Sequence, residues 1–296
     1  MEIRDKNGLT EKEFLAQYKP GDYERPSVAA DMVIFTAKVC QEDNYRKLPQ
    51  KKLQILLIKR GGHPYINTWA LPGGFVNPDE TTEQAAKREL LEETGIDNIY
   101  LEQLYTFSDP HRDPRMWVMS CAYMALVDSQ KISVSAGDDA KSAEWFDISL
   151  KTEHTDINET NNGFISITDY ILSLQKDNET LSAKVRLTKT RTDNGIDTNY
   201  EIISSEGLAF DHAKIITFAI LRLRGKVTYT DIALNLVPEY FTLTELQQIY
   251  EIILDKELLK APFRRKYSIL AEETDMFSKY AGHRPSQLFR KKWLTE

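Results

Sequence analysis

The chain has 296 residues, of which 41% are hydrophobic and 28% are charged, and this ordinary globular usage excludes wholesale disorder. At about 100–200 residues per domain, the length predicts two domains. The net charge of −7 disfavours nucleic-acid binding by the chain as a whole. The charge is uneven, however, because residues 206–296 hold 14 basic and 12 acidic side chains. A basic C-terminal part on an acidic protein points to an anionic partner.

The sequence also predicts the compartment. No run of about 18 apolar residues occurs, and the charged start contains no apolar signal segment, so neither membrane spanning nor secretion is expected. Cys40 and Cys121 lie far apart in the sequence and do not suggest a disulfide framework. We therefore expect a cytoplasmic protein.

In chain order, a polar lead-in with a short helix at residues 11–18 comes first, and a mixed α/β domain follows. Short apolar and β-branched runs predict its strands, with a polar turn at residues 40–50 and a loop rich in Gly, Pro and Asn at residues 61–75. The runs expected to form strands are residues 29–39, 51–60, 99–107, 116–127 and 143–148.

A helix is expected at residues 82–94. Thr81 and Gln84 fit a capping box at its start, and Gly95 fits the left-handed position after its end.

Residues 150–205 predict a late extension of the first domain, which therefore covers residues 1–205. The stretch ISITDYILSLQKD, residues 165–177, has helical spacing of its apolar residues, so we expect a helix there. Residues 184–203 predict two strands around an Asn-Gly turn, which is a strong hairpin signal.

The pattern becomes helical from about Gly207 and predicts a second domain, residues 206–296. Asp211 fits the N-cap of its first helix, and Thr242 and Glu245 have capping-box spacing. The expected elements are helices at residues 211–226, 230–238, 242–256 and 258–270, and a two-stranded wing at residues 271–293.

Three glutamates of the helix at residues 82–94 point the same way. At about 100° per residue, Glu89, Glu92 and Glu93 share an arc of about 100°. Carboxylates that close repel one another, and a hard cation such as Mg²⁺, which prefers oxygen ligands, relieves the repulsion. Arg88 lies four residues before Glu92 and can brace it. A solvated acidic helix face is the usual alternative.

The residues around this helix resemble the Nudix family. The stretch from Gly74 through Glu80 to Arg88-Glu89-Leu90-Leu91-Glu92-Glu93-Thr94-Gly95-Ile96 matches the Nudix box at seven fixed and two aliphatic positions across 23 residues. The resemblance covers about residues 28–150. It implies an α/β/α sandwich with a mixed sheet, and the hydrolysis of nucleoside diphosphates linked to another moiety.

The resemblance also implies roles for particular residues. Glu89, Glu92 and Glu93 are the expected ligands of Mg²⁺ (or Mn²⁺), with Gly74 letting the backbone pass close to the ion. Glu80 and Arg88 are expected to support them. Glu144 is a candidate general base, since a later loop often supplies the base in similar enzymes; a plain surface glutamate is the alternative.

The loop at residues 108–115 suggests a substrate site. Arg112 and Arg115 can grip phosphate, and the neighbouring Phe107 can stack on a base or ribose. The alternative is an ordinary turn in which Asp113 pairs with an arginine. The stretch DPHRDPR resembles the Nudix branch that handles ADP-ribose. Arg60 is a further candidate for ligand contact, with a solvated arginine as the alternative.

His63, His111 and His212 show no metal-ligand spacing, so they are interpreted as ordinary polar residues. Neither cysteine is expected to act as a nucleophile.

The second domain predicts a winged helix, which places one helix in the DNA major groove and a wing against phosphates. The basic candidates for DNA contact are Arg264, Arg265, Lys266, Arg284, Arg290, Lys291 and Lys292. A helical oligomerisation domain is the alternative. The stretches LAFDHAKII, FTLTELQQIYE, FRRK and GHRPSQLFR resemble the C-terminal domain of Nudix-related transcriptional regulators of NAD metabolism. That resemblance implies double-stranded DNA as a partner and a homodimer.

Two functions follow. The first is Mg²⁺-dependent hydrolysis of the pyrophosphate of ADP-ribose or a related nucleoside diphosphate derivative. The second is repression of NAD-metabolism genes by a protein that senses ADP-ribose with little or no hydrolysis. Because the Nudix box is intact, hydrolysis is the leading hypothesis.

Overall fold

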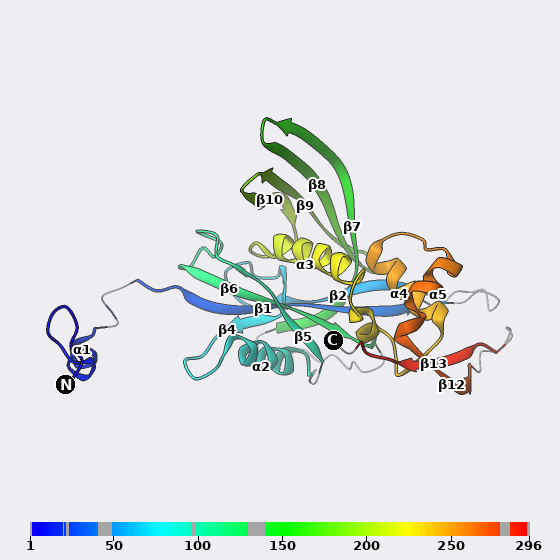
Figure 1. The fold of residues 1–296 in the computed structure, drawn as a ribbon, viewed down its shortest axis with the longest axis horizontal. Helices are drawn as coiled ribbons and strands as arrows, with labels where there is room; N and C mark the ends of the chain where they lie inside the picture. The colour runs from blue at the N-terminus through cyan, green and yellow to red at the C-terminus, as the bar shows by residue number, and fades with distance from the viewer. Residues whose placement is uncertain are drawn as a thin grey trace.

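A large mixed sheet forms the centre of the protein in the computed structural model (Figure 1). The structure describes residues 2–19, 21, 24–40, 49–95, 97, 99–129, 140–278 and 285–294. The sheet has the order β10-β9-β8-β7-β2-β1-β6-β5, with β3 paired to β2 and β4 paired to β1. Its strands are β1 (Ser27–Cys40), β2 (Gln50–Arg60), β3 (Trp69–Ala70), β4 (Gly73–Phe75), β5 (Tyr100–Phe107), β6 (Val118–Val127), β7 (Ala140–Thr160), β8 (Gly163–Lys176), β9 (Glu179–Thr192) and β10 (Gly195–Glu206).

Helices cover both faces of the sheet. Strand β1 runs parallel to β6 and antiparallel to β2, and its middle is buried on both sides. Phe35 belongs to the core beneath α3 (His212–Lys226), whereas Met32 and Ile34 pack against Ala85 and Ala86 of α2 (Thr82–Thr94). This alternation follows the two-residue period of a strand. The expected α/β/α sandwich with a mixed sheet is confirmed.

The two helices before residue 100 begin as the sequence predicts. In α1 (Glu11–Gln17) and in α2 a threonine caps the first turn, and the third helical residue returns the hydrogen bond. Gly95 ends α2 in the left-handed conformation, with φ of 70°. Helix α1 stands away from the body at the N-terminal end (Figure 1), whereas α2 lies directly on β1 and β4.

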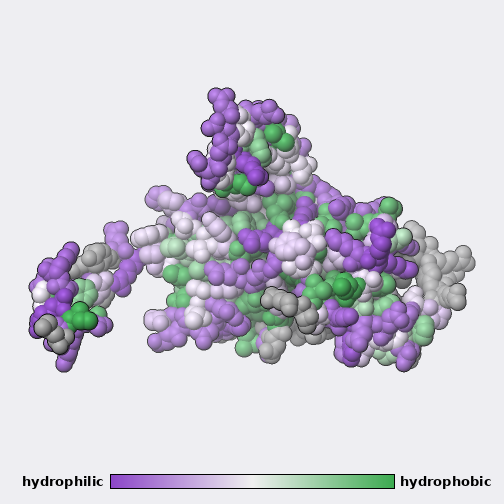
Figure 2. All heavy atoms as spheres, viewed as in Figure 1, coloured by the Kyte–Doolittle hydropathy of each residue, from purple (hydrophilic) through white to green (hydrophobic). Residues whose placement is uncertain are grey.

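The late extension is a sheet throughout its length, and the helix expected at residues 165–177 is wrong. These residues form β8, which pairs with β7 on one side and β9 on the other. The β-branched Ile165, Ile167 and Ile171 favour a strand, and continuous pairing on both edges satisfies the backbone. The expected hairpin at Asn194–Gly195 is confirmed. Strands β7 to β10 rise above α3 as a curved arm whose tip is hydrophilic (Figures 1 and 2).

The C-terminal part is a winged helix, as predicted. Its elements are η3 (Ile232–Leu236), β11 (Tyr240–Phe241), α4 (Leu243–Leu254), α5 (Lys260–Tyr267), η4 (Ser268–Leu270), β12 (Ala271–Phe277) and β13 (Gln287–Lys291). The last two strands form the wing, and β11 pairs with β13 to complete a three-stranded sheet. Thr242 and Glu245 form the expected capping box of α4. None of the helices described is both long and apolar enough to cross a membrane.

Helix α3 connects the two parts. Its inner face contributes Ile215, Ile216, Ala219 and Leu223 to a core shared with β8, β9 and α4. The segment before it, residues 207–209, runs beside β3, where Trp69 donates to Gly207 and Ala209 donates to Trp69. The entrance to α3 is therefore attached to the first domain.

Candidate functional site

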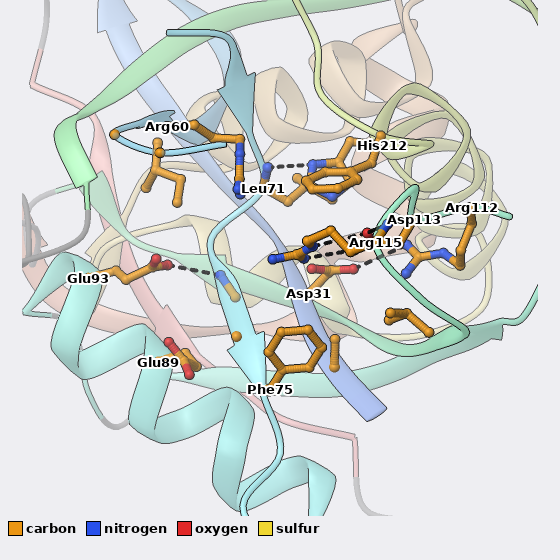
Figure 3. Close-up of a pocket in the computed structure, with 18 residues that line it drawn as sticks. Asp31, Arg60, Leu71, Phe75, Glu89, Glu93, Arg112, Asp113, Arg115 and His212 are labelled. Atoms are coloured by element: carbon orange, nitrogen blue, oxygen red, sulfur yellow. Dashed lines mark hydrogen bonds and ion pairs between the residues drawn. The ribbon is translucent and has the colours of Figure 1, made fainter. Parts of the chain in front are cut away.

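A cavity of about 750 Å³ opens between β1, β4, α2, the loop at residues 108–115 and the entrance to α3 (Figure 3). Glu89 and Glu93 reach it from α2, while Arg112 and Arg115 reach it from the opposite side. Its lining residues are Ala29, Asp31, Ile58, Arg60, Gly61, Gly62, Leu71, Gly73, Gly74, Phe75, Glu89, Glu93, Arg112, Asp113, Arg115, Val118, Phe210 and His212. The volume lies within the range of about 300–1,000 Å³ that small-molecule sites occupy.

Two glycines of β4 make room for the acidic wall of the cavity, which consists of Glu89 and Glu93. A Cβ atom at Gly74 would lie 2.0 Å from Glu89 Oε1, so only glycine leaves room for that carboxylate. A Cβ atom at Gly73 would lie 2.3 Å from the carbonyl oxygen of Ala30, and Gly73 has φ of 151°. The amide of Gly73 donates to Glu93 Oε2 at 2.9 Å. Both glutamates are thereby held against the β4 backbone.

Arg88 organises the carboxylates behind this wall. It donates to both oxygens of Glu80, at 2.6 and 3.0 Å, to Glu89 Oε1 at 2.7 Å, and to the carbonyl oxygen of Phe75 at 3.1 Å. The hydrogen bonds from Arg88 are the main cause that lowers the pKa of Glu80 to about 2. Burial raises the pKa of Glu89, and the Arg88 guanidinium opposes that rise. Arg88 therefore joins Glu80, Glu89 and the β4 backbone in one hydrogen-bonded cluster.

The third expected metal ligand lies elsewhere. The Glu92 side chain is 58% exposed, contacts Arg88 at 3.2 Å, and does not line the cavity. Within the described part of the chain, no three acidic, histidine or cysteine side chains lie close enough to hold a metal ion by themselves. The structure thus brings Glu89, Glu93 and Gly74 together at the cavity and leaves Glu92 outside it.

The loop arginines line the cavity but already hold carboxylate partners. Arg115 donates to both oxygens of Asp113, at 3.0 and 2.7 Å, so the pairing considered as the alternative does form. Its guanidinium also lies 5.5 Å from the ring centre of Phe75 and 5.8 Å from that of Phe210. Arg115 can therefore meet an anion in the cavity while Asp113 fixes its orientation.

Arg112 is more deeply engaged. Its side chain is 5% exposed, and it donates to Asp211 Oδ2 through Nε at 2.9 Å and to Asp211 Oδ1 through Nη2 at 2.7 Å. Nη2 also approaches Asp31 Oδ2 at 3.4 Å, and Ser120 donates to that same oxygen at 2.5 Å. Arg112 therefore joins the substrate loop to the first residues of the C-terminal part.

Arg60 faces the cavity rather than bulk solvent. It donates to the carbonyl oxygen of Pro64 at 2.8 Å and lies 4.9 Å from the ring centre of Phe210. Burial, followed by the nearby Arg115 charge, lowers its pKa. Arg60 and Arg115 are thus two cations that share a partly buried space, where an anion would relieve their mutual repulsion.

Two residues expected at the site are not there. Phe107 is 1% exposed and packs edge-on against Phe218 of α3, in the core on the α3 side of the sheet. Glu144 pairs with Leu57, a residue of that same core, so its side chain belongs to the sheet face opposite α2. There it meets Lys176 at 2.7 Å. Neither Phe107 nor Glu144 lines the cavity. The expected stacking by Phe107 and the expected proton transfer by Glu144 therefore do not fit their positions in the structure.

Among the cavity residues that were not predicted as site residues, four have side chains that can contact a ligand: Asp31, Phe75, Phe210 and His212. Phe210 has φ of 51°, a left-handed conformation that aromatic residues rarely adopt. His212 is buried, and its Nδ1 accepts a hydrogen bond from the Leu71 amide at 2.9 Å. Burial lowers the pKa of His212, so the imidazole is neutral and carries its proton on Nε2.

Sequence signals for these four residues were weak. Phe75 follows the two glycines in a stretch expected to be a loop, and no sequence pattern distinguished it as a site residue. Phe210 and His212 lie more than 100 residues after the Nudix box, and only folding brings them to it. Their shared signal is the sequence FDH before the α3 pattern, where the aspartate was interpreted as an N-cap, the histidine as an ordinary polar residue and the phenylalanine not at all.

The expected DNA-contacting residues lie on the winged helix. Arg264 and Arg265 are exposed on α5, and neither forms an ion pair with a residue that the structure describes. Lys266 donates to the carbonyl oxygen of Thr228 at 3.2 Å. On β13, Arg290 pairs with Glu272 at 2.7 Å, whereas Lys291 lies 6.0 Å from the ring centre of Trp293. Lys292 is exposed beyond the strand, and Arg284 lies outside the described residues.

Comparisons with known proteins match two families along the chain. Residues 47–165 match the family described as NUDIX domain, and residues 233–290 match the NrtR DNA-binding winged helix domain. The chain is 36% identical to the ADPR responsive transcriptional repressor NtrR of Acinetobacter baylyi, over 96% of this chain and 89% of that protein.

Two further similarities cover, respectively, the first part of the chain and most of its length. The chain is 41% identical to the ADP-ribose pyrophosphatase of Methanocaldococcus jannaschii over 126 residues, which cover 43% of this chain and 64% of that protein. It also resembles the crystal structure of Shewanella oneidensis NrtR complexed with a 27mer DNA, with a TM-score of 0.56 and 26% identity. That similarity covers 90% of this chain and 93% of the other.

Proposed function

We infer a function from the family to which the chain belongs, that of the NrtR-type regulators, in which a Nudix hydrolase domain precedes a DNA-binding winged helix. We propose that the Nudix domain cleaves the pyrophosphate of ADP-ribose or a related nucleoside diphosphate derivative, with Mg²⁺ (or Mn²⁺). The observation that carries this proposal is the cavity, in which the carboxylates of Glu89 and Glu93 face Arg60 and Arg115. Hydrolysis of a diphosphate needs arginines that bind its oxygens and carboxylates that hold the metal ion.

The arginine wall binds the substrate in this proposal. Arg115 is oriented by Asp113, and Arg60 lies over the Phe210 ring, so two guanidinium groups converge on one space. Planar guanidinium groups bind phosphate oxygens in pairs. The rings of Phe75 and Phe210 at the same cavity supply faces on which a base or ribose can stack.

The acidic wall fits the ion that the Nudix family implies. Glu89 is half-buried with its carboxylate pressed into the space that Gly74 leaves, and Glu93 is fixed by the Gly73 amide. Mg²⁺ is commonly bound by one or two carboxylates together with substrate phosphates, so Glu89 and Glu93 suffice for one ion. When bound, the ion neutralises phosphate oxygens and lowers the pKa of a water molecule.

Hydrolysis is tested by replacing Glu93. Glu93→Gln keeps the side-chain size and removes the charge, so we expect phosphate release from ADP-ribose (after phosphatase coupling) to fall by about 100-fold or more. Glu144→Gln is the matched control, since Glu144 lies on the far face of the sheet. If the wild-type protein hydrolyses none of the compounds in a nucleotide panel with Mg²⁺ or Mn²⁺, the enzymatic role is excluded.

A second function is favoured by the shape of the same cavity. Phe210 and His212, which lead into the helix before the winged helix, form part of its wall. A ligand there contacts both parts of the chain. We therefore propose that the protein is a repressor that responds to ADP-ribose, acting as a homodimer in the cytoplasm, since two-fold symmetry matches paired half-sites in DNA.

DNA binding is tested by a mobility shift on DNA from upstream of NAD-synthesis genes. Arg265 is exposed on α5, so Arg265→Ala should weaken binding and reduce the slope of log affinity against log salt by about 1. Arg222→Ala, on the exposed side of α3, serves as the control. Binding that is insensitive both to 200 mM salt (about the range over which phosphate contacts weaken) and to Arg265→Ala would contradict this role.

A further inference from the structure

Asp211 occupies the N-cap position of α3 without capping it. An aspartate there normally accepts a hydrogen bond from an amide in the first turn, which stabilises the helix. Here the side chain makes no such bond. Both carboxylate oxygens are instead bound by Arg112, at 2.9 and 2.7 Å. The helix thus begins without a stabilising contact that its own sequence could supply.

The partner that holds Asp211 also lines the ligand cavity. Arg112 is buried there and contacts two aspartates, of which Asp31 is fixed by Ser120. A pyrophosphate in the cavity is a third anion with more charge than either carboxylate, and guanidinium groups bind such oxygens in pairs. Asp211 is the carboxylate able to leave, because it contacts the loop from the start of a helix and has the Ala213 amide of that helix to bind.

We propose that Asp211 is a positioning residue that couples the cavity to the DNA-binding domain. An anionic ligand that engages Arg112 releases Asp211, whose carboxylate then caps the first turn of α3. The proposal rests on the function proposed above, in which ADP-ribose is the ligand.

The far end of α3 is connected to the winged helix. Arg224 donates to the carbonyl oxygen of Leu150 in the sheet and to that of Ile253 in α4, both at 3.0 Å. Helix α3 spans about 22 Å at about 1.5 Å per residue, so it reaches from the cavity to the contact with α4 of the winged helix. A second contact of α3 with the same loop, from Lys214 to Asp109 at 2.6 Å, involves no residue of the cavity lining.

Two variants separate the two contacts. Asp211→Asn keeps an N-cap as good as aspartate but lacks the charge that binds Arg112. Asp109→Asn breaks the Lys214 contact in the same loop and serves as the matched control. DNA affinity is measured by fluorescence anisotropy with and without ADP-ribose, and ADP-ribose affinity by calorimetry.

In the unmodified protein we expect ADP-ribose to change DNA affinity by about 5-fold to 150-fold, the usual range of coupling between sites. Asp109→Asn should keep that ratio. Asp211→Asn should bind ADP-ribose yet show a ratio within about 2-fold of one, with a ligand-free DNA affinity equal to that of the liganded unmodified protein. A full ratio in Asp211→Asn would overturn the coupling role.

Hydrogen exchange tests the same step in the unmodified protein, even if the variant does not fold. The amide of Ala213, in the first turn of α3, should gain several-fold protection on saturation with ADP-ribose, whereas the Lys214 amide already donates to the Asp211 carbonyl oxygen at 2.9 Å. Saturation without that gain would overturn the role of Asp211 and leave the proposed function standing. Absence of ADP-ribose binding would overturn the proposed function and this inference together.

Discussion

At the scale of single residues, the acidic wall depends on an absent side chain. Glu89 is placed by the missing Cβ atom of Gly74 and by Arg88, which holds Glu80 and Glu89 together. The Nudix resemblance implied that Gly74, Glu80 and Arg88 lie beside the metal ligands, because all of them belong to one motif of 23 residues. The sequence did not predict that Glu92 remains outside the cavity. The angular positions of side chains around a helix do not show where the rest of the cavity lies.

Gly74→Ala tests this arrangement. The new Cβ atom would lie 2.0 Å from Glu89 Oε1, so the carboxylate must move, and we expect ADP-ribose hydrolysis to fall by about 10-fold to 100-fold. Gly62→Ala is the control, because Gly62 lines the same cavity and a Cβ atom there meets nothing within 4 Å. Equal activity of the two variants would mean that the approach of Glu89 to the backbone does not matter.

At the scale of elements, local signals predicted helix ends better than they predicted the extension. Capping boxes at Thr81 and Thr242 depend on contacts three residues apart, and both form. The stretch from 165 to 177 failed because its apolar spacing suits either a helix or a strand. Pairing with β7 and β9 decides between them, and those partners lie outside the stretch itself.

At the scale of the whole molecule, the site joins residues that no local pattern connects. Phe210 and His212 reach the cavity because residues 207–209 run beside Trp69, far away in the sequence. Resemblance predicted the order of the domains, but their shared core under α3 is a tertiary feature. Helix α3 contributes to the ligand site, to the cover of the sheet and to the contact with α4.

Arg224→Ala tests that contact. The guanidinium serves two carbonyl oxygens in different parts of the protein, and its removal leaves them unpaired, so we expect unfolding free energy to fall by about 1–3 kcal/mol. Arg222→Ala removes an exposed arginine from the same helix and should cost less than about 1 kcal/mol. Denaturant titration measures both, and equal losses would contradict the bridging role.

The left-handed backbone of Phe210 has an evolutionary consequence. For a non-glycine residue this conformation costs about 1–2 kcal/mol, yet the position holds a large aromatic ring against Arg60 at the ligand cavity. Selection for heat resistance alone favours glycine or asparagine there, whereas selection for the proposed ligand binding would oppose that exchange. A thermostable variant selected without a test of ligand binding would therefore tend to lose Phe210, and with it the ring that faces Arg60 at the cavity.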